Sequence, residues 1–218
     1  RYQFVKDSIY AVTTSEVYLD SIDSVYNRVT FMDIIWEGIG FSNRKKKRYI
    51  YFPAIPTLVN PFVIGGARVG PNVAYFKKWE NEQTLFVGGR LDMGIRNQDL
   101  KGIVSLDYRY DPMHLGTVGL FAGKTFNLIA QNDAVTFLFQ RSNWIEENRF
   151  SPYITRELVN GLQGSLAIEY VERLPINGYE FGEITEDWFG GNDPLTFARY
   201  QTFITTVSLS YTPFQKYM

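Results

Sequence analysis

The sequence contains no cysteine, a single histidine and no stretch that approaches 18 uninterrupted apolar residues. Without cysteine the chain has no disulfide framework and no thiolate metal site. One histidine supplies too few nitrogen ligands for an ordinary protein zinc site. A transmembrane helix needs about 20 consecutive apolar residues, so we expect no helix of this chain to cross a membrane.

The chain also lacks a strong charge of either sign. Lys and Arg number 22 against 23 Asp and Glu, which gives a formal net charge of −1. The only dense basic run is residues 44–48, Arg-Lys-Lys-Lys-Arg. One run without a basic face elsewhere is a weak indication of nucleic-acid binding. We therefore expect a solvated strand end at this run and no nucleic-acid partner.

What the chain does contain is alternation of apolar and polar residues with a period close to two. In the clearest stretch the apolar residues are Val104, Leu106, Tyr108 and Tyr110, and the polar ones are Ser105, Asp107 and Arg109. Residues 84–96, 165–170 and 202–211 alternate similarly. Each stretch is about as long as a tilted strand that crosses a bilayer, and each offers one face to an apolar phase and one to water or a polar interior.

Aromatic residues make up 17% of the chain, with 15 Tyr, 17 Phe and 4 Trp. Tyr and Trp have an apolar body and a polar edge, and membrane barrels carry them as girdles at both interfaces. Soluble β-sandwiches are rich in Tyr and Phe as well. The aromatic content alone therefore fits either class, and strand length favours the membrane barrel.

The pattern predicts one helix followed by strands. Thr13 and Glu16 form a potential capping box before a helix within residues 13–30, which we expect to pack against a neighbouring domain or barrel rim. Residues 32–41 fit either a helix end or a first strand. Pro71 lies inside one of the expected strands and weakens its centre. The expected strands are residues 47–55, 62–76, 84–96, 101–110, 117–125, 134–141, 149–158, 163–173 and 199–212.

The connections between these strands should alternate between the two sides of a membrane. Side one would hold residues 77–83, 111–116, 142–148 and the long excursion 174–198. Side two would hold residues 97–99, 126–133 and the Asn160-Gly161 turn. Bacterial barrels have short periplasmic turns and longer outer loops, so we expect side one to face the cell exterior.

These features predict an all-β fold, a transmembrane antiparallel β-barrel of which this chain is a part. We expect residues 1–44 to form a linker with a short amphipathic helix and residues 45–218 to form the incomplete barrel region. The sequence begins at Arg1 and shows no signal peptide, which an outer-membrane protein needs. We therefore expect a processed or partial chain.

No residue set indicates catalysis or metal binding. His114 lies in an expected turn, and we expect a loop residue there instead of part of a Ser-His-Asp site. The carboxylates near the end of the chain match no EF-hand spacing, so we expect a solvated loop instead of a calcium site. They are Glu180, Glu183, Glu186, Asp187 and Asp193, beside Trp188. The glycine pairs at 65–66, 88–89 and 190–191 precede no helix and should ease strand curvature instead of holding phosphate.

The order of several short motifs resembles one family. They are the helix before the strands and residues 60–66 (Asn-Pro-Phe-Val-Ile-Gly-Gly), 88–90, 93–96, 131–133 and 208–217. The family is the large Bacteroidota outer-membrane family of carboxypeptidase-regulatory-like domain proteins, whose C-terminal part is a domain of unknown function. The resemblance implies a small β-sandwich before Arg1 and further barrel strands after Met218. It implies no peptidase activity and no catalytic residues.

We expect a non-enzymatic outer-membrane barrel that serves as a structural or assembly component of a Gram-negative envelope complex. Its expected partners are outer-membrane lipid and other envelope proteins, and no cofactor is expected. A barrel that transports or binds a solute or lipid is one alternative, and an outer-membrane hydrolase is another. The expected inward residues carry both charge signs, so ion pairs could fill the interior or a wet channel could run through it. These residues are Arg90, Asp92, Arg96, Ser105, Asp107, Arg109 and Glu169.

Overall fold

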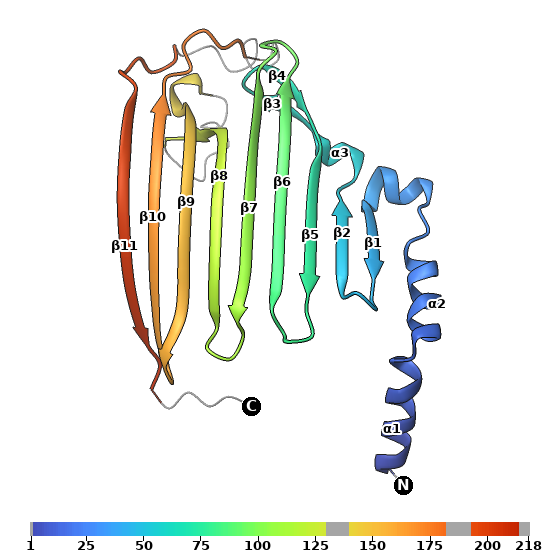
Figure 1. Cartoon of the computed structure of the whole chain (residues 1–218). Coiled ribbons are helices and arrows are strands. Elements are labelled where there is room, and N and C mark those ends of the chain that lie inside the picture. The colour runs from blue at the N-terminus through green and yellow to red at the C-terminus, as the bar shows by residue number, and fades with distance from the viewer. Residues whose placement is uncertain (1, 130–139, 182–192, 214–218) are drawn as a thin grey trace.

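One large antiparallel sheet dominates the computed structural model, which describes residues 2–129, 140–181 and 193–213 (Figure 1). Its eleven strands are β1 (Ile39–Asn43), β2 (Arg48–Phe52), β3 (Val59–Val63), β4 (Gly66–Val69), β5 (Asn72–Lys78), β6 (Thr84–Gly94), β7 (Leu100–Asp111), β8 (Gly116–Leu128), β9 (Trp144–Val159), β10 (Leu162–Leu174) and β11 (Tyr200–Tyr211). The helical elements are α1 (Tyr2–Thr13), α2 (Glu16–Tyr26), the π-helix η1 (Asp33–Glu37), α3 (Ile55–Leu58) and the 3₁₀ helix η3 (Arg141–Asn143). None of the described helices is long and apolar enough to span a membrane.

The sheet is open. Its main path runs β1-β2-β5-β6-β7-β8-β9-β10-β11, while β3 pairs with β4 and β4 pairs with one end of β6. The described residues thus form an antiparallel sheet that is not closed into a barrel, and the expectation that this chain is an incomplete part of a transmembrane barrel stays a prediction. All neighbours on this nine-strand path are antiparallel, so β1 and β11, the first and the ninth strand, point the same way (Figure 1). An antiparallel closure would need at least one further strand between them.

Most of the expected strands are confirmed. Strands β6 to β11 have 11 to 16 residues each, which is long compared with the 5 or 6 residues common in soluble domains. The expected strand at 62–76 is instead divided into β3, β4 and β5, and Pro71 stands just before β5. A proline lacks the N–H that a ladder needs, which explains the break. The expected strand at 134–141 lies almost entirely outside the described residues.

The predicted sides of the connections are partly wrong. Because β8 pairs directly with β9, no strand lies between them in the sheet, and every later connection lies on the side opposite to the expected one, relative to the earlier connections. The turns at 79–83, 112–115 and 160–161 lie at one end of the sheet, which we call the short-turn end (Figure 1). The connections that follow β6, β8 and β10 begin and end at the other, the long-loop end. Short and long connections are thus separated more completely than the sequence suggested.

The register sorts apolar and polar side chains onto opposite faces of β6 to β11. Directly opposed residues of antiparallel neighbours lie on the same face. One row across these six strands is Leu85, Tyr108, Val118, Ile154, Leu166 and Val207. The adjacent row on the other face is Thr84, Arg109, Thr117, Thr155, Ser165 and Ser208. The predicted faces of β6, β7, β10 and β11 are therefore confirmed.

The apolar face has no cover among the described residues. Ile154 and Leu166 are each 40% exposed and Val207 is 71% exposed. The helices α1, α2 and α3 lie beyond β5 toward the β1 edge of the sheet, not over β6 to β11 (Figure 1). Among the described residues only six apolar residues are buried, and three of them, Ile64, Ile176 and Phe181, pack together in one cluster. The sheet thus lacks the second layer that a soluble domain uses to bury an apolar face.

The expected N-terminal helix is confirmed as α2, with a different cap. Thr13 ends α1, and Ser15 is the N-cap of α2, accepting a hydrogen bond from Tyr18 N. The helix α2 packs beside the edge strand β1. Asn27, just after α2, accepts from Ser42 N at 2.7 Å and donates to Ser42 O at 2.8 Å. This amide therefore satisfies the two backbone groups that a neighbouring strand would otherwise use, and it blunts the β1 edge.

On the polar face one row links three strands through a tyrosine. Asp107 of β7 lies opposite Gly119 of β8, which lies opposite Tyr153 of β9. The Tyr153 hydroxyl donates a hydrogen bond to Asp107 Oδ1, so its ring passes over Gly119. A Cβ atom at Gly119 would overlap that ring. The absence of a side chain at Gly119 is what lets Tyr153 reach two strands away.

We predict that Gly119→Ala displaces the Tyr153 ring and breaks its bond to Asp107. Hydrogen bonds to charged groups contribute about 1.5–3 kcal/mol, so chemical denaturation of the full chain should show a loss of about that size. Tyr153→Phe should lose a similar amount, and the double variant should lose less than the sum because both changes remove one bond.

Gly89→Ala is the matched control, because a Cβ there meets no atom closer than 3.9 Å. It should leave the free energy of unfolding unchanged or slightly higher. Additive losses for Gly119→Ala and Tyr153→Phe would contradict the proposed contact.

Candidate functional site: a buried ionic cluster at the long-loop end

Arg68 is the centre of a group of charged side chains that we call the ionic cluster. Its side chain is only 2% exposed, a position that charged residues rarely occupy unless paired. Arg68 Nε lies 2.5 Å from Asp92 Oδ1, and its two terminal nitrogens bind Asp99 Oδ1 at 2.8 Å and Oδ2 at 3.1 Å. This two-pronged contact suits the planar guanidinium. It joins β4, β6 and the turn after β6.

Lys101 of β7 extends the ionic cluster toward β8 and β9. Its ammonium donates to Glu146 Oε2 at 2.7 Å and to the Tyr179 hydroxyl at 2.9 Å. It also lies 4.6 Å from the centre of the Phe126 ring, a cation–π distance. Glu146 receives a second cation, Lys124, whose Nζ is 2.6 Å from Oε1. Glu146 and Lys101 are both almost fully buried, and each has partners that compensate its charge.

The loop after β10 returns across the sheet and covers this end. Ile176 and Phe181 are buried against Ile64 of the β3–β4 turn. Gly65 N donates to Glu180 O at 2.6 Å, and Arg96 Nη1 donates to Phe181 O at 2.6 Å. The strands β7, β8 and β9 lie between β10 and β6 in the sheet order. Residues 175–181, which we call the returning loop, therefore span the ends of several strands before they dock.

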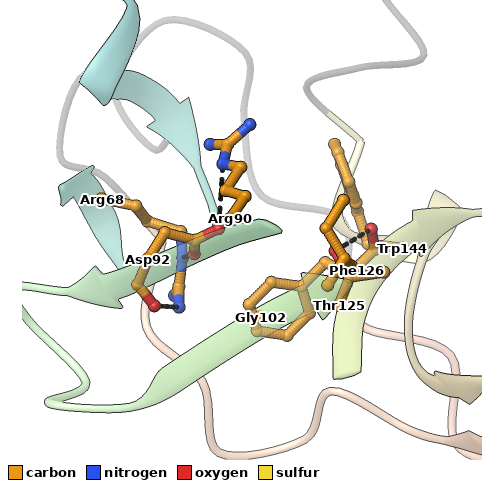
Figure 2. Close-up of a pocket in the computed structure, with 8 residues that line it drawn as sticks. Arg68, Arg90, Asp92, Gly102, Thr125, Phe126 and Trp144 are labelled. Atoms are coloured by element: carbon orange, nitrogen blue, oxygen red, sulfur yellow. Dashed lines mark hydrogen bonds and ion pairs between the residues drawn. The ribbon is translucent and has the colours of Figure 1, made fainter. Parts of the chain in front are cut away.

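A hollow of about 190 Å³ lies beside the ionic cluster (Figure 2). Arg68, Arg90 and Asp92 form one wall, and Phe126 with Trp144 forms another. In Figure 2 the Arg68 and Arg90 side chains approach the Asp92 carboxylate from two sides, and Arg90 Nε is 3.4 Å from Asp92 Oδ2. The polar groups that face this hollow thus already bind one another.

The surroundings shift the acidity of two groups in the loops. Burial opposes ionisation of Asp99, but the hydrogen bonds and charge of Arg68, together with the charge of Lys101, hold its pKa below the usual range. Burial raises the pKa of the Tyr179 hydroxyl, and its contact with Glu146 raises it further. Asp99 therefore stays ionised and Tyr179 stays protonated at neutral pH. Asp99 favours the folded state at neutral pH, and this contribution falls as acid protonates it.

Residues singled out in the sequence lie away from this cluster or are only partly described. His114 is half-exposed at the short-turn end, where its Nδ1 lies 3.0 Å from Asp111 Oδ2. Glu183, Glu186, Asp187, Trp188 and the 190–191 glycines lie outside the described residues. Glu180 docks through its backbone, with its N–H 2.9 Å from Asn97 Oδ1. Across the described ranges, no group of three or more metal-ligating side chains is present.

The basic run has a structural role that the sequence did not indicate. Arg44 Nη1 lies 2.5 Å from Asp23 Oδ1, and Lys45 Nζ lies 2.7 Å from Asp20 Oδ2. Two of its five cations thus hold α2 against the β1–β2 hairpin. Of the glycine pairs, Gly65 and Gly66 adopt positive φ in a tight turn, in keeping with a conformational role.

The members of the ionic cluster were missed by the sequence reasoning, apart from Arg90 and Asp92. The available signal was the alternation of side chains between the two faces of a strand. Arg68 lies opposite Gly94 and Lys101 opposite Asp92, and Asp92 and Gly94 share one face of β6, so these charges lie on the polar face. Glu146 was assigned to a connection because β9 begins several residues earlier than expected. Gly94 provided a second signal, because a Cβ there would overlap both Asp99 and Arg68.

The fold and the cluster define an open antiparallel sheet, with the returning loop docked on the β3–β4 turn at its long-loop end. The chain matches a family model described as "Family of unknown function (DUF5686) C-terminal domain" over residues 32–218. The chain belongs to this family. No curated protein and no solved structure matches it. The expected domain of unknown function is therefore confirmed, and the boundary expected near residue 45 stays a prediction.

We predict that Lys101→Met destabilises the chain far more than Lys124→Met. Both lysines bind Glu146, but the Lys101 side chain is 2% exposed and that of Lys124 is 48% exposed. Removing a buried partner costs about 3–5 kcal/mol, whereas an exposed pair contributes at most about 1 kcal/mol. Chemical denaturation of the full chain measures both.

Adding Glu146→Gln to Lys101→Met should restore part of the loss, because the carboxylate no longer lies buried beside a missing cation. Equal losses for the two lysine variants would show that the cluster is not an electrostatic unit.

Proposed function

We propose that this chain forms part of the wall of a non-enzymatic outer-membrane β-barrel that serves as a structural or assembly component of the envelope. The observation that carries the proposal is the uncovered apolar face of β6 to β11. In water such a face would be an aggregation liability. Against lipid it is the expected outer surface of a barrel.

The dimensions of the apolar face support a bilayer. Leu85 and Met93 lie at opposite ends of the apolar set on β6. Eight residues at about 3.3 Å each give roughly 26 Å along the strand. The apolar band of outer-membrane barrels is about 25 Å tall, and strands tilt by about 35–45°. One strand therefore covers most of the apolar layer.

The arrangement of the connections supports the same reading and an orientation. Outer-membrane barrels have short turns on the periplasmic side and longer loops outside. The turns at 79–83, 112–115 and 160–161 would then be periplasmic, and the 175–199 connection would be external. This keeps the expected external position of the long excursion. It reverses the expected positions of the turns after β5 and β7 and of the connections after β6 and β8.

The contents of the polar face favour a structural component over a transporter. The ionic cluster compensates its own charges, and the returning loop spans the long-loop end. On the wall itself, Arg149 lies 2.7 Å from Glu147 and 3.8 Å from Glu169. Paired charges under a docked loop provide little free polar surface for a passing solute. The sequence resemblance to carboxypeptidase-regulatory-like outer-membrane proteins of Bacteroidota also supports this proposal.

We predict that Leu106→Arg blocks membrane assembly of the full-length protein and that Ser105→Arg does not. Leu106 shares the apolar face with Val87 and Leu120, whereas Ser105 lies opposite Gly88 and Phe121 on the polar face. An Arg facing lipid at the bilayer midplane costs about 2–4 kcal/mol. The readout is the fraction of protein recovered in outer membranes as a heat-resistant folded species.

The two positions are adjacent in one strand and receive the same substitution, so a difference between the two variants reports which face of the strand carries the Arg. If Ser105→Arg abolished assembly and Leu106→Arg did not, the faces would be assigned the wrong way round. Normal assembly of both variants would contradict the membrane proposal.

A further inference from the structure

A second hollow lies at the short-turn end, remote from the ionic cluster. It has a volume of about 470 Å³ and is bounded by the β1–β2 turn and the end of β5. We call it the lysine hollow, after Lys46, Lys47, Lys77 and Lys78, which line it together with Trp79. Lys78 N donates to Lys47 O at 2.8 Å and Lys77 Nζ donates to Lys46 O. These bonds hold the two turns side by side.

The lysine hollow has an excess of positive charge although the whole chain is nearly neutral. Lys45 is neutralised by Glu16 and Asp20 of α2, and Lys78 pairs with Glu82. Glu80 also lines the hollow. Within the described residues, Lys46, Lys47 and Lys77 form no ion pair, and nothing else concentrates unpaired lysines in this way.

The hollow lies at the margin of the apolar face. The register places Lys77 opposite Leu85, and Leu85 opposite Tyr108 of the apolar row. The Trp79 ring meets the Tyr108 ring edge-on at 6.0 Å, and Lys77 Nζ lies 5.9 Å from the Trp79 ring centre. Trp and Tyr favour the bilayer interface, where lysine can keep its stem on apolar surface and its ammonium among headgroups.

We propose that the lysine hollow binds the phosphate of a glycerophospholipid headgroup while the acyl chains lie along the apolar face of β5, β6 and β7. Lysine acts as a point-charge ligand for phosphate, and Lys46, Lys47 and Lys77, which form no ion pair within the described residues, outnumber the one carboxylate, Glu80, that lines the hollow with them. The acyl chains explain why the cations line a hollow together with Trp79, whose ring contacts Tyr108 of the apolar face. The inference rests on the proposed membrane position and adds a lipid-specific site to it.

The test uses purified full-length protein in neutral detergent, with bound molecules counted by native mass spectrometry. Phosphatidylglycerol, uncharged diacylglycerol and inorganic phosphate are titrated separately. The triple variant Lys46→Gln, Lys47→Gln and Lys77→Gln should weaken phosphatidylglycerol binding by about tenfold or more, since each lysine near an anionic surface contributes on the order of a fivefold effect. The corresponding triple Arg variant should retain it.

Arg156→Gln is the matched control. Arg156 lies opposite Gly164 in the register of the apolar face, near the same end of the sheet. Its charge is compensated by Asp111, whose Oδ2 lies 3.0 Å from Arg156 Nη2. Binding should be unchanged in this variant. An equal loss in the control and the triple Gln variant would overturn the site, as would undiminished binding in the triple Gln variant. If inorganic phosphate bound as tightly as phosphatidylglycerol, the ligand would be a free anion and the lipid proposal would be wrong.

Membrane flotation of the same proteins separates this inference from the proposed function. Full-length protein that fails to float with lipid vesicles would contradict the membrane proposal itself. Protein that floats, while its triple Gln variant binds phosphatidylglycerol as the unaltered chain does, would overturn only the lysine hollow.

Discussion

The shared register of β6 to β11 is the constraint on which the rest of the structure depends. Side chains alternate between faces with a period of two, so a slip of one residue in any strand would exchange its faces. The rows that begin at Leu85 and Thr84 stay wholly apolar and wholly polar across six strands. The uncovered apolar face, the Tyr153 bridge and the ionic cluster all require that register.

The two edges of the open sheet differ in how their backbone groups are satisfied. Each unpaired backbone group in hydrocarbon costs several kcal/mol, so a wall in a membrane needs both edges covered. At β1, Asn27 and Asp23 already bind backbone groups of Ser42 and Arg44. At β11, the described residues provide no neighbour on the outer side. The two edges therefore differ, and β11 is the edge that is ready to accept a further strand.

Period-two patterning made the long strands and their faces predictable, because alternation is a local property of the sequence. The returning loop and the ionic cluster were not predictable in this way. Arg68 and Asp99 are 31 positions apart, and Lys101 and Tyr179 are 78 apart, so only the folded sheet brings them together. The side of each connection depended on the number of strands in the sheet. Because β8 pairs directly with β9, the turns at 77–83 and 111–116 lie at the same end as the Asn160-Gly161 turn and not opposite it.

The most direct test of the membrane-wall account is site-by-site labelling of β7 in native membranes. Residues 1–218 contain no cysteine, so a single cysteine introduced at each of positions 104 to 109 can be compared with the unaltered protein as the background control. A lipid-soluble reagent should label 104, 106 and 108, and label 105, 107 and 109 weakly. Labelling without a two-residue period, or strong labelling of 104, 106 and 108 by a membrane-impermeant, water-soluble reagent, would contradict the claim that this face contacts lipid.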